Sequence, residues 1–174
     1  MQRINIEIKA RCGHPEEIRE LLDKQQAVFA GTDPQVDTYF NVPHGRLKLR
    51  EGNIENALIH YRRDNLAGPK RSDVFLYKTL PKSDLREILT RALGVLAVVS
   101  KRRSIYYIDN VKFHIDEVQE LGSFVEIEAI GEDESVGEDK LREQCQYYLN
   151  LFKVQSEDLV EVSYSDMILE KRVQ

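Results

Sequence analysis

Two neighbouring segments carry ionisable side chains at a spacing that could support chemistry. The stretch 111–130 is predicted to form two strands joined by a turn at 119–122. Side chains of a strand alternate between its two faces, so each of these strands has one apolar face and one ionisable face. Glu126 and Glu128 share a face, where two carboxylates repel each other unless a cation lies against them. The ionisable face of the first strand is formed by Lys112, His114 and Asp116.

Similar polar faces recur along the chain. The opening strand places Asn5 and Glu7 on the same face as two cations, opposite a run of isoleucines. A single strand of this kind is explained by a half-solvated sheet. Its repetition indicates an anion site, because Lys and Arg bind phosphate groups. Carboxylates, together with phosphate oxygens, bind magnesium. By strand phase, Arg63 and Arg102 are expected outside this site. The in-phase cations are Lys9, Arg11, Lys48, Arg50, Arg62, Lys78, Lys101 and Arg103.

Several common catalytic motifs are missing. The sequence has no GxxxxGK[ST] loop, no GxGxxG segment after a strand, no HExxH helix and no GxSxG elbow. None of the four histidines is paired at a metal-ligand spacing. The recurring cations and carboxylates are therefore the main chemical signal.

Composition predicts one globular domain spanning residues 1–174. The chain is 41% hydrophobic and 32% charged, which argues against disorder. Its net charge of −5 argues against a general nucleic-acid partner but allows a basic pocket for a small polyanion. The longest apolar stretch, around 93–99, is too short to span a bilayer, and no secretory signal is apparent. We expect a cytoplasmic protein without a membrane partner.

The expected elements are about eight strands and three helices, at 15–27, 83–94 and 137–154. Short turns between strands favour antiparallel connections and an α+β fold that is mainly antiparallel β. We expect 31–35 to be a loop, 36–41 a short strand, and the tail at 159–169 a helical turn or a last strand. An open sheet would turn the polar faces to water, whereas a closed barrel could turn them inward around a ligand.

At these residues the sequence resembles the CYTH domain family. The resemblance covers nearly the whole chain and is closest to the class IV adenylate cyclase-like branch. Its motifs are NxExK at 5–9, GRLKLR at 45–50, KRR at 101–103, HIDEV at 114–118, LGSF at 121–124, VEIE at 125–128 and SYSD at 163–166. The resemblance implies a closed eight-stranded antiparallel barrel, or tunnel, with flanking helices, which holds a triphosphate.

The resemblance also implies an activity and a set of site residues. A cyclase would convert ATP into cyclic AMP and pyrophosphate; the alternatives are hydrolysis of inorganic or thiamine triphosphate, and binding of a nucleotide or polyphosphate without turnover. Mg²⁺ or Mn²⁺ would be the cofactor, and a homodimer is compatible with the family. Asp116 is either a metal ligand or a partner of a cation, and His114 is either a packed residue or a proton shuttle. The expected metal ligands are Glu7, Glu126, Glu128, Asp116 and Asn5, and the expected catalytic residues are Lys9, Arg103 and His114.

One position departs from the family pattern. The first glutamate of the family's ExExK motif is replaced by Asn5. An amide offers a carbonyl oxygen but no negative charge, and divalent hard cations depend on charged oxygen ligands. We therefore expect one metal to bind firmly and a second to bind weakly.

Overall fold

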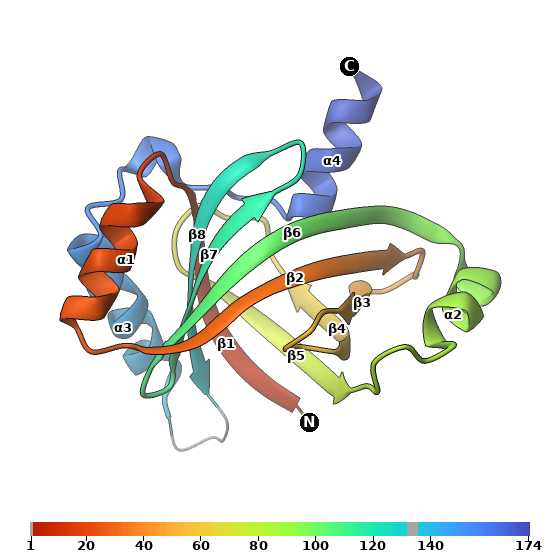
Figure 1. Ribbon diagram of the computed structural model, residues 1–174, viewed down its shortest axis with the longest axis horizontal. Coiled ribbons are helices and arrows are strands. Elements are labelled where there is room, and N and C mark those ends of the chain that lie inside the picture. Colours follow the sequence, from red (N-terminus) through yellow and green to blue (C-terminus); the bar gives the residue numbers. More distant parts are fainter. Residues whose placement is uncertain (1, 132–135) are drawn as a thin grey trace.

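A computed structural model describes residues 2–131 and 136–174 of the chain (Figure 1). Its strands are β1 (Gln2–Arg11), β2 (Val28–Phe40), β3 (Arg46–Glu51), β4 (Ala57–Arg63), β5 (Lys70–Lys78), β6 (Val95–Ile108), β7 (Val111–Val118) and β8 (Gly122–Gly131). Its helices are α1 (Pro15–Lys24), α2 (Leu85–Leu93), α3 (Glu138–Leu151) and α4 (Tyr164–Val173), with a short 3-10 turn at Ser156–Asp158.

The strands form a closed antiparallel barrel in the order β1-β5-β4-β3-β2-β6-β7-β8. Closure comes from β1, which pairs with β5 on one side and with β8 on the other. The predicted α+β class, the eight strands and the closed tunnel are thus confirmed. Within the described residues, no helix has the length and apolar character needed to cross a membrane.

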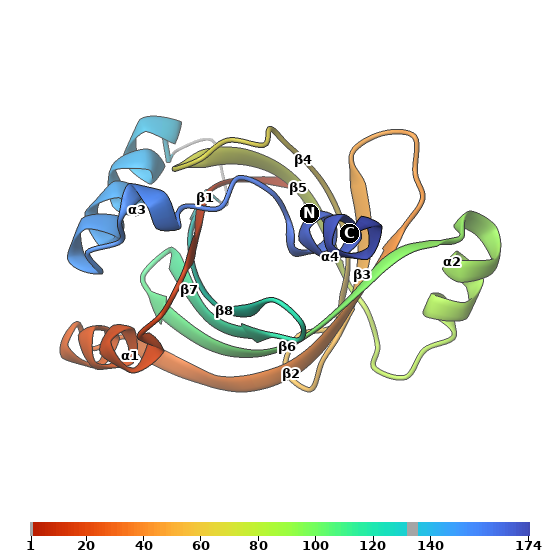
Figure 2. The same cartoon turned by 90° about the horizontal axis from the view of Figure 1, so that it is seen from above.

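Helices on the outside decide which strand faces turn inward. Helices α1 and α3 lie beside β1, β7 and β8 and pack on their apolar faces (Figures 1 and 2). This outer core includes Ile6, Ile8, Phe113, Ile127 and Leu22, all essentially buried. Because these apolar faces are covered from outside, the alternating Glu, Lys and His side chains of the same strands point into the barrel.

The C-terminal helix closes part of one end of the barrel, where it lies over the opening in Figure 2. Ser163 caps α4 through a capping box with Asp166, and Asp166 also pairs with Arg46 of β3 at 2.7 Å. The ring of Tyr164 packs edge-on against Phe124, with 5.0 Å between centroids. A helical turn was one of the two outcomes expected for this tail, and the structure extends it to a full helix.

Strand β2 is longer than the sequence predicts. The segment 31–35, expected to be a loop because of its turn residues, pairs continuously with β6, including Pro34 opposite Arg102. Gly31 adopts a φ of 124°, next to a register shift in this pairing. The expectation of a loop was therefore wrong, because pairing with a distant strand outweighed the local turn preference.

Candidate functional site

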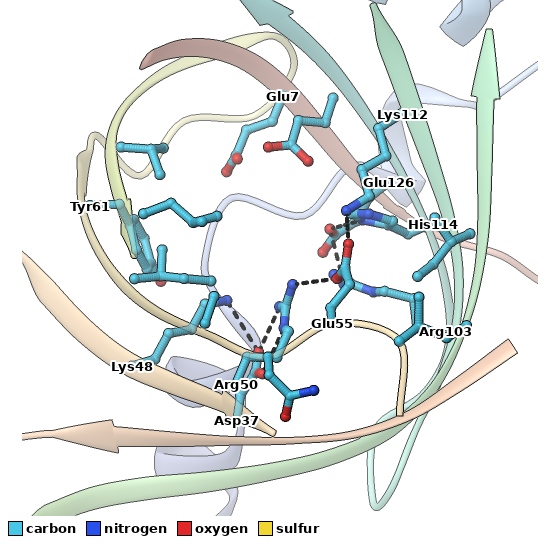
Figure 3. Close-up of a pocket in the computed structure, with 18 of the residues that line it drawn as sticks. Glu7, Asp37, Lys48, Arg50, Glu55, Tyr61, Arg103, Lys112, His114 and Glu126 are labelled. Carbon is cyan, nitrogen blue, oxygen red and sulfur yellow. Dashed lines mark hydrogen bonds and ion pairs between the residues drawn. The ribbon is translucent and has the colours of Figure 1, made fainter. Parts of the chain in front are cut away.

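The barrel encloses a cavity of about 740 Å³ (Figure 3). Among the described residues that line it, nine are Lys or Arg and five are Asp or Glu, so its walls carry an excess of positive charge. Such a cavity suits a small, highly charged anion. The lining cations are Arg3, Lys9, Lys48, Arg50, Arg63, Lys78, Lys101, Arg103 and Lys112, and the lining acids are Glu7, Asp37, Glu55, Glu126 and Glu128.

Three carboxylates share the wall formed by β1 and β8. Glu7 lies directly opposite Glu128 in the strand register, and Lys9 lies opposite Glu126. Glu7 pairs with Arg63 of β4, the second strand along from β1, whereas the side-chain amide of Asn5 donates to Glu128. This wall is the acidic side of the cavity.

The ammonium of Lys9 lies between this wall and helix α4. Its Nζ is 3.6 Å from Glu126 and 3.9 Å from the centre of the Tyr164 ring. Burial lowers the pKa of Lys9 from 10.5 to about 8, against the opposing effect of Glu126. A lysine with this pKa can both bind phosphate as a cation and accept a proton.

A buried aspartate organises the basic side of the cavity. The carboxylate of Asp37 accepts hydrogen bonds from Arg50 at 2.9 and 2.8 Å, from Lys101 at 2.8 Å and from Lys48 at 3.2 Å. Burial raises the pKa of Asp37, but the charge of Arg50 and its neighbours holds it well below its ordinary value. Burial also lowers the pKa of Lys101 to about 7. Asp37 thus holds three cations from two strands together.

Arg103 is fixed in a buried network in the wall of the cavity. Its guanidinium donates to both oxygens of Asp116, at 2.7 and 2.6 Å, and to Glu126 at 3.2 Å. The hydroxyl of Tyr164 donates to Asp116 at 2.7 Å. Asp116 is fully buried and does not line the cavity. Of the two roles expected for Asp116, the structure places it as a partner of a cation.

His114 has one ring nitrogen that could accept a proton. Its Nδ1 lies 3.0 Å from Glu126, and its Nε2 is buried without a hydrogen-bond partner among the described residues. Burial and then Arg103 lower the pKa of His114 below 6.5, so the imidazole is neutral near pH 7. With Glu126 ionised, the proton resides on Nδ1 and Nε2 has a free lone pair.

The remaining wall is apolar. Side chains of β4 and β5 that face the lumen include Ile59, Tyr61 and Val74, which also belong to a buried apolar cluster with α4. Tyr61 lies across the cavity from His114 and Glu126 in Figure 3. A ligand with both a charged and an uncharged part would therefore meet matching surfaces.

The carboxylate wall fits a divalent cation only in partnership with a substrate. No group of three or more His, Cys, Asp or Glu side chains in the described residues converges on one metal position. Magnesium, however, is commonly held by one or two carboxylates plus substrate phosphates. Glu7 and Glu128 face each other across β1 and β8, and the buried carbonyl oxygen of Asn5 beside them has no hydrogen-bond partner in the described residues. These oxygen donors match the requirement.

Most predicted site residues line the cavity. Arg103 is buried and Arg102 exposed, as strand phase predicted. Lys78 lines the cavity through an exposed side chain. Asn5 lies against Glu128 behind the lining residues. The predicted residues found in the lining are Glu7, Lys9, Lys48, Arg50, Lys78, Lys101, Arg103, His114, Glu126 and Glu128.

Two of the predicted phosphate contacts lie outside the cavity. Arg11 is exposed past the end of the cavity, with its guanidinium 5.3 Å from the ring of Phe124, because β1 continues beyond the lumen. Arg62 points outward and is exposed, whereas Arg63 lines the cavity. Among the described residues, no helix packs on the outer face of β4, and its apolar residues Ile59 and Tyr61 form the inner wall instead, which reverses the phase expected for these two arginines.

Sequence reasoning missed several lining residues. Lys112 shares a strand face with His114 and could have been included on that ground. Asp37 is the single charged residue of the predicted strand 36–41, so its three cations were not foreseeable. Glu55 lies in a loop, where no periodic signal exists. Tyr164 reaches the cavity only because α4 folds back over the barrel.

The chain belongs to the CYTH domain family, whose model matches residues 3–164. This match spans most of the barrel and reaches the start of α4. The tunnel is therefore the triphosphate tunnel of this family. No curated protein matches the sequence.

Solved structures with the same fold include proteins from archaea, bacteria and plants. The PH1012 protein from Pyrococcus horikoshii OT3 is 24% identical, with a TM-score of 0.77 over 93% of this chain and 98% of its own. A candidate adenylate cyclase from Vibrio parahaemolyticus is 18% identical, with a TM-score of 0.74 over 96% and 98% of the two chains. A candidate adenylyl cyclase from Hippeastrum, described as having a dominant triphosphatase activity, is 13% identical, with a TM-score of 0.63 over 99% and 96%.

Proposed function

We propose that this protein binds ATP in the tunnel and converts it into cyclic AMP and pyrophosphate. The observation that carries the proposal is that one closed cavity has a cationic side, a carboxylate wall and an apolar wall. A triphosphate needs the cationic side, its metal ion needs the carboxylate wall, and an organic group attached to the triphosphate needs the apolar wall. Inorganic triphosphate would leave the apolar wall without a partner.

Each wall has a role in binding. The phosphates lie against the cations that Asp37 gathers, where the dense positive charge stabilises the charge of the leaving pyrophosphate. Glu7, Glu126 and Glu128 would hold Mg²⁺ or Mn²⁺, which would supply charge neutralisation at the phosphates. The adenine lies against the apolar wall, with Tyr61 as its aromatic partner.

The chemical step is an intramolecular displacement at the α-phosphorus. The ribose 3′-oxygen forms a bond to this phosphorus while the bond to the bridging oxygen of pyrophosphate breaks. The 3′-hydroxyl proton passes to Lys9 in its neutral form, or to the free Nε2 of His114. Arg103, held in place by Asp116, stabilises the charge that develops on the phosphorane oxygens.

Hydrolysis is the second candidate reaction. The Hippeastrum protein shares this fold and is described as having a dominant triphosphatase activity. In that reaction water replaces the ribose hydroxyl as nucleophile and attacks the terminal phosphorus, using the same cations and carboxylates. Thiamine triphosphate and inorganic triphosphate are the substrates to compare with ATP.

Product analysis distinguishes these reactions. The protein is incubated with Mg²⁺ or Mn²⁺ and, separately, with ATP, thiamine triphosphate and inorganic triphosphate, and the products are identified by phosphorus NMR. Cyclic AMP with pyrophosphate supports the cyclase, whereas orthophosphate supports the hydrolase. Glu126→Gln should abolish turnover, and Glu117→Gln, on the exposed face of β7, should leave it unchanged. Binding of a triphosphate without any product would leave only a binding role and contradict the proposal.

A further inference from the structure

The loop between β3 and β4 is held in one shape by a buried aspartate. The carboxylate of Asp33, which is fully buried, accepts hydrogen bonds from the backbone N–H groups of Asn53, Ile54 and Glu55 at 2.6, 3.0 and 2.9 Å. A Cβ at Gly52 would come within 2.5 Å of this carboxylate, so only glycine fits there. The loop is therefore a fixed platform whose backbone does not depend on the side chain of Glu55.

This platform directs the carboxylate of Glu55 into the lumen. Glu55 pairs with Arg50 of β3 at 3.2 Å and with Lys112 of β7, and it accepts a hydrogen bond from Gln35 of β2 at 3.0 Å. Strands β3 and β7 are separated in the barrel by β2 and β6, so Glu55 bridges two walls. Figure 3 shows its carboxylate between Arg50 and Lys112 within the cavity.

Glu55 differs from the other acid on the basic side of the cavity. The side chain of Asp37 is 1% exposed and belongs to a strand, whereas that of Glu55 is 20% exposed and comes from a loop. Asp37 therefore holds its cations together from a buried position in the barrel wall. Glu55, which is more exposed than Asp37, pairs with Arg50 and Lys112 within the cavity.

We infer that Glu55 is an intrinsic competitor for phosphate, occupying the anion position between Arg50 and Lys112 until a triphosphate displaces it. The inference rests on the proposed function, because it requires a triphosphate in the tunnel. Rotation about the side-chain bonds of Glu55 is enough to release the two cations, since Asp33 holds only the backbone. The displaced carboxylate remains near the phosphates and repels them, unless a divalent cation offsets its charge. Glu55 thereby favours a metal-bound triphosphate over a metal-free one.

Calorimetry with inorganic triphosphate tests this role. We compare the wild type with Glu55→Gln, first with EDTA and then with Mg²⁺. Without metal, Glu55→Gln should bind about tenfold tighter or more, because one negative charge beside the phosphates is removed. With Mg²⁺ the gain should be smaller. Glu55→Asp, which keeps the charge, should stay closer to the wild type, and Glu51→Gln, whose partner is Arg86 outside the cavity, should match it.

The outcomes separate this inference from the proposed function. If neither the wild type nor Glu55→Gln binds triphosphate while both remain folded by circular dichroism, the proposed function and the inference both fail. If the wild type binds and Glu55→Gln binds equally or more weakly without metal, the inference alone is overturned. A large loss of affinity confined to the Mg²⁺ experiment would identify Glu55 as a metal-holding residue, which also overturns it.

Discussion

Two adjacent arginines of β4 provide a direct test of which strand faces line the tunnel. Arg63 points into the cavity, where its side chain is 6% exposed and pairs with Glu7, while Arg62 is exposed outside. The change Arg63→Gln keeps a side chain that can donate to Glu7 but removes the charge. Arg62→Gln is the matched control, because it removes the same charge one residue away.

The expected loss follows from the contacts. A hydrogen bond to a charged group contributes about 1.5–3 kcal/mol, which corresponds to about 10- to 150-fold in affinity. In Arg63→Gln the negative charge of Glu7 is no longer balanced. This charge repels phosphate and therefore lowers the triphosphate affinity further. Glu7 is 22% exposed and open to the cavity, so its loss of an ionic partner should cost the fold less than breaking a fully buried pair, which costs about 3–5 kcal/mol.

Calorimetric titration of both variants with ATP and inorganic triphosphate measures the difference. Arg62→Gln should be nearly neutral, with less than about a twofold change, since exposed charges outside the cavity are screened. Thermal unfolding of each variant checks that binding differences do not reflect misfolding. Equal losses from the two variants, or a larger loss from Arg62→Gln, would refute the assignment of the β4 inner face.

Three further changes probe the metal, the proton balance and the support of the site. Asn5→Glu should place a second negative charge beside Glu128 and increase the number or the affinity of bound Mn²⁺ ions, measured by electron paramagnetic resonance. A Mn²⁺ titration identical to that of the wild type would mean that residue 5 lies away from the metal. Burial lowers the pKa of Lys9 to about 8, so Lys9 loses its charge above that pH and triphosphate affinity should fall between pH 7 and 9. The Lys9→Arg variant should show a smaller fall. If its pH profile of affinity is identical to that of the wild type, Lys9 does not take part in binding. Tyr164→Phe deprives the buried Asp116 of a hydrogen bond and should lower the free energy of unfolding by about 1–3 kcal/mol in urea titrations, whereas a neutral effect would mean that water replaces the hydroxyl.

The strand faces of β1, β7 and β8 were predictable because their apolar and polar residues alternate without ambiguity. Ile6 and Ile8 need a hydrophobic cover, which α1 and α3 supply, so Glu7 and Lys9 had to face the opposite way. Arg103 followed the same rule on β6. On β4, both faces contain apolar residues and cations, and periodicity could not say which face is inside.

Loop and terminal contributions had no comparable signal. Glu55 enters the cavity because Asp33, 22 residues away in sequence, binds its backbone N–H. Tyr164 reaches Asp116 because α4 packs against the end of the barrel. These contacts depend on the closed barrel, which brings distant segments together after the strands have paired.

The sequence by itself determined the family, through its motifs, and the inner and outer faces of most strands, because side chains alternate with a period of two. Only the tertiary structure decided which acid neutralises which cation, such as Glu7 with Arg63 and Asp37 with Lys101. Which charged residues meet depends on which strands lie side by side in the closed barrel and on their register, rather than on separation along the chain.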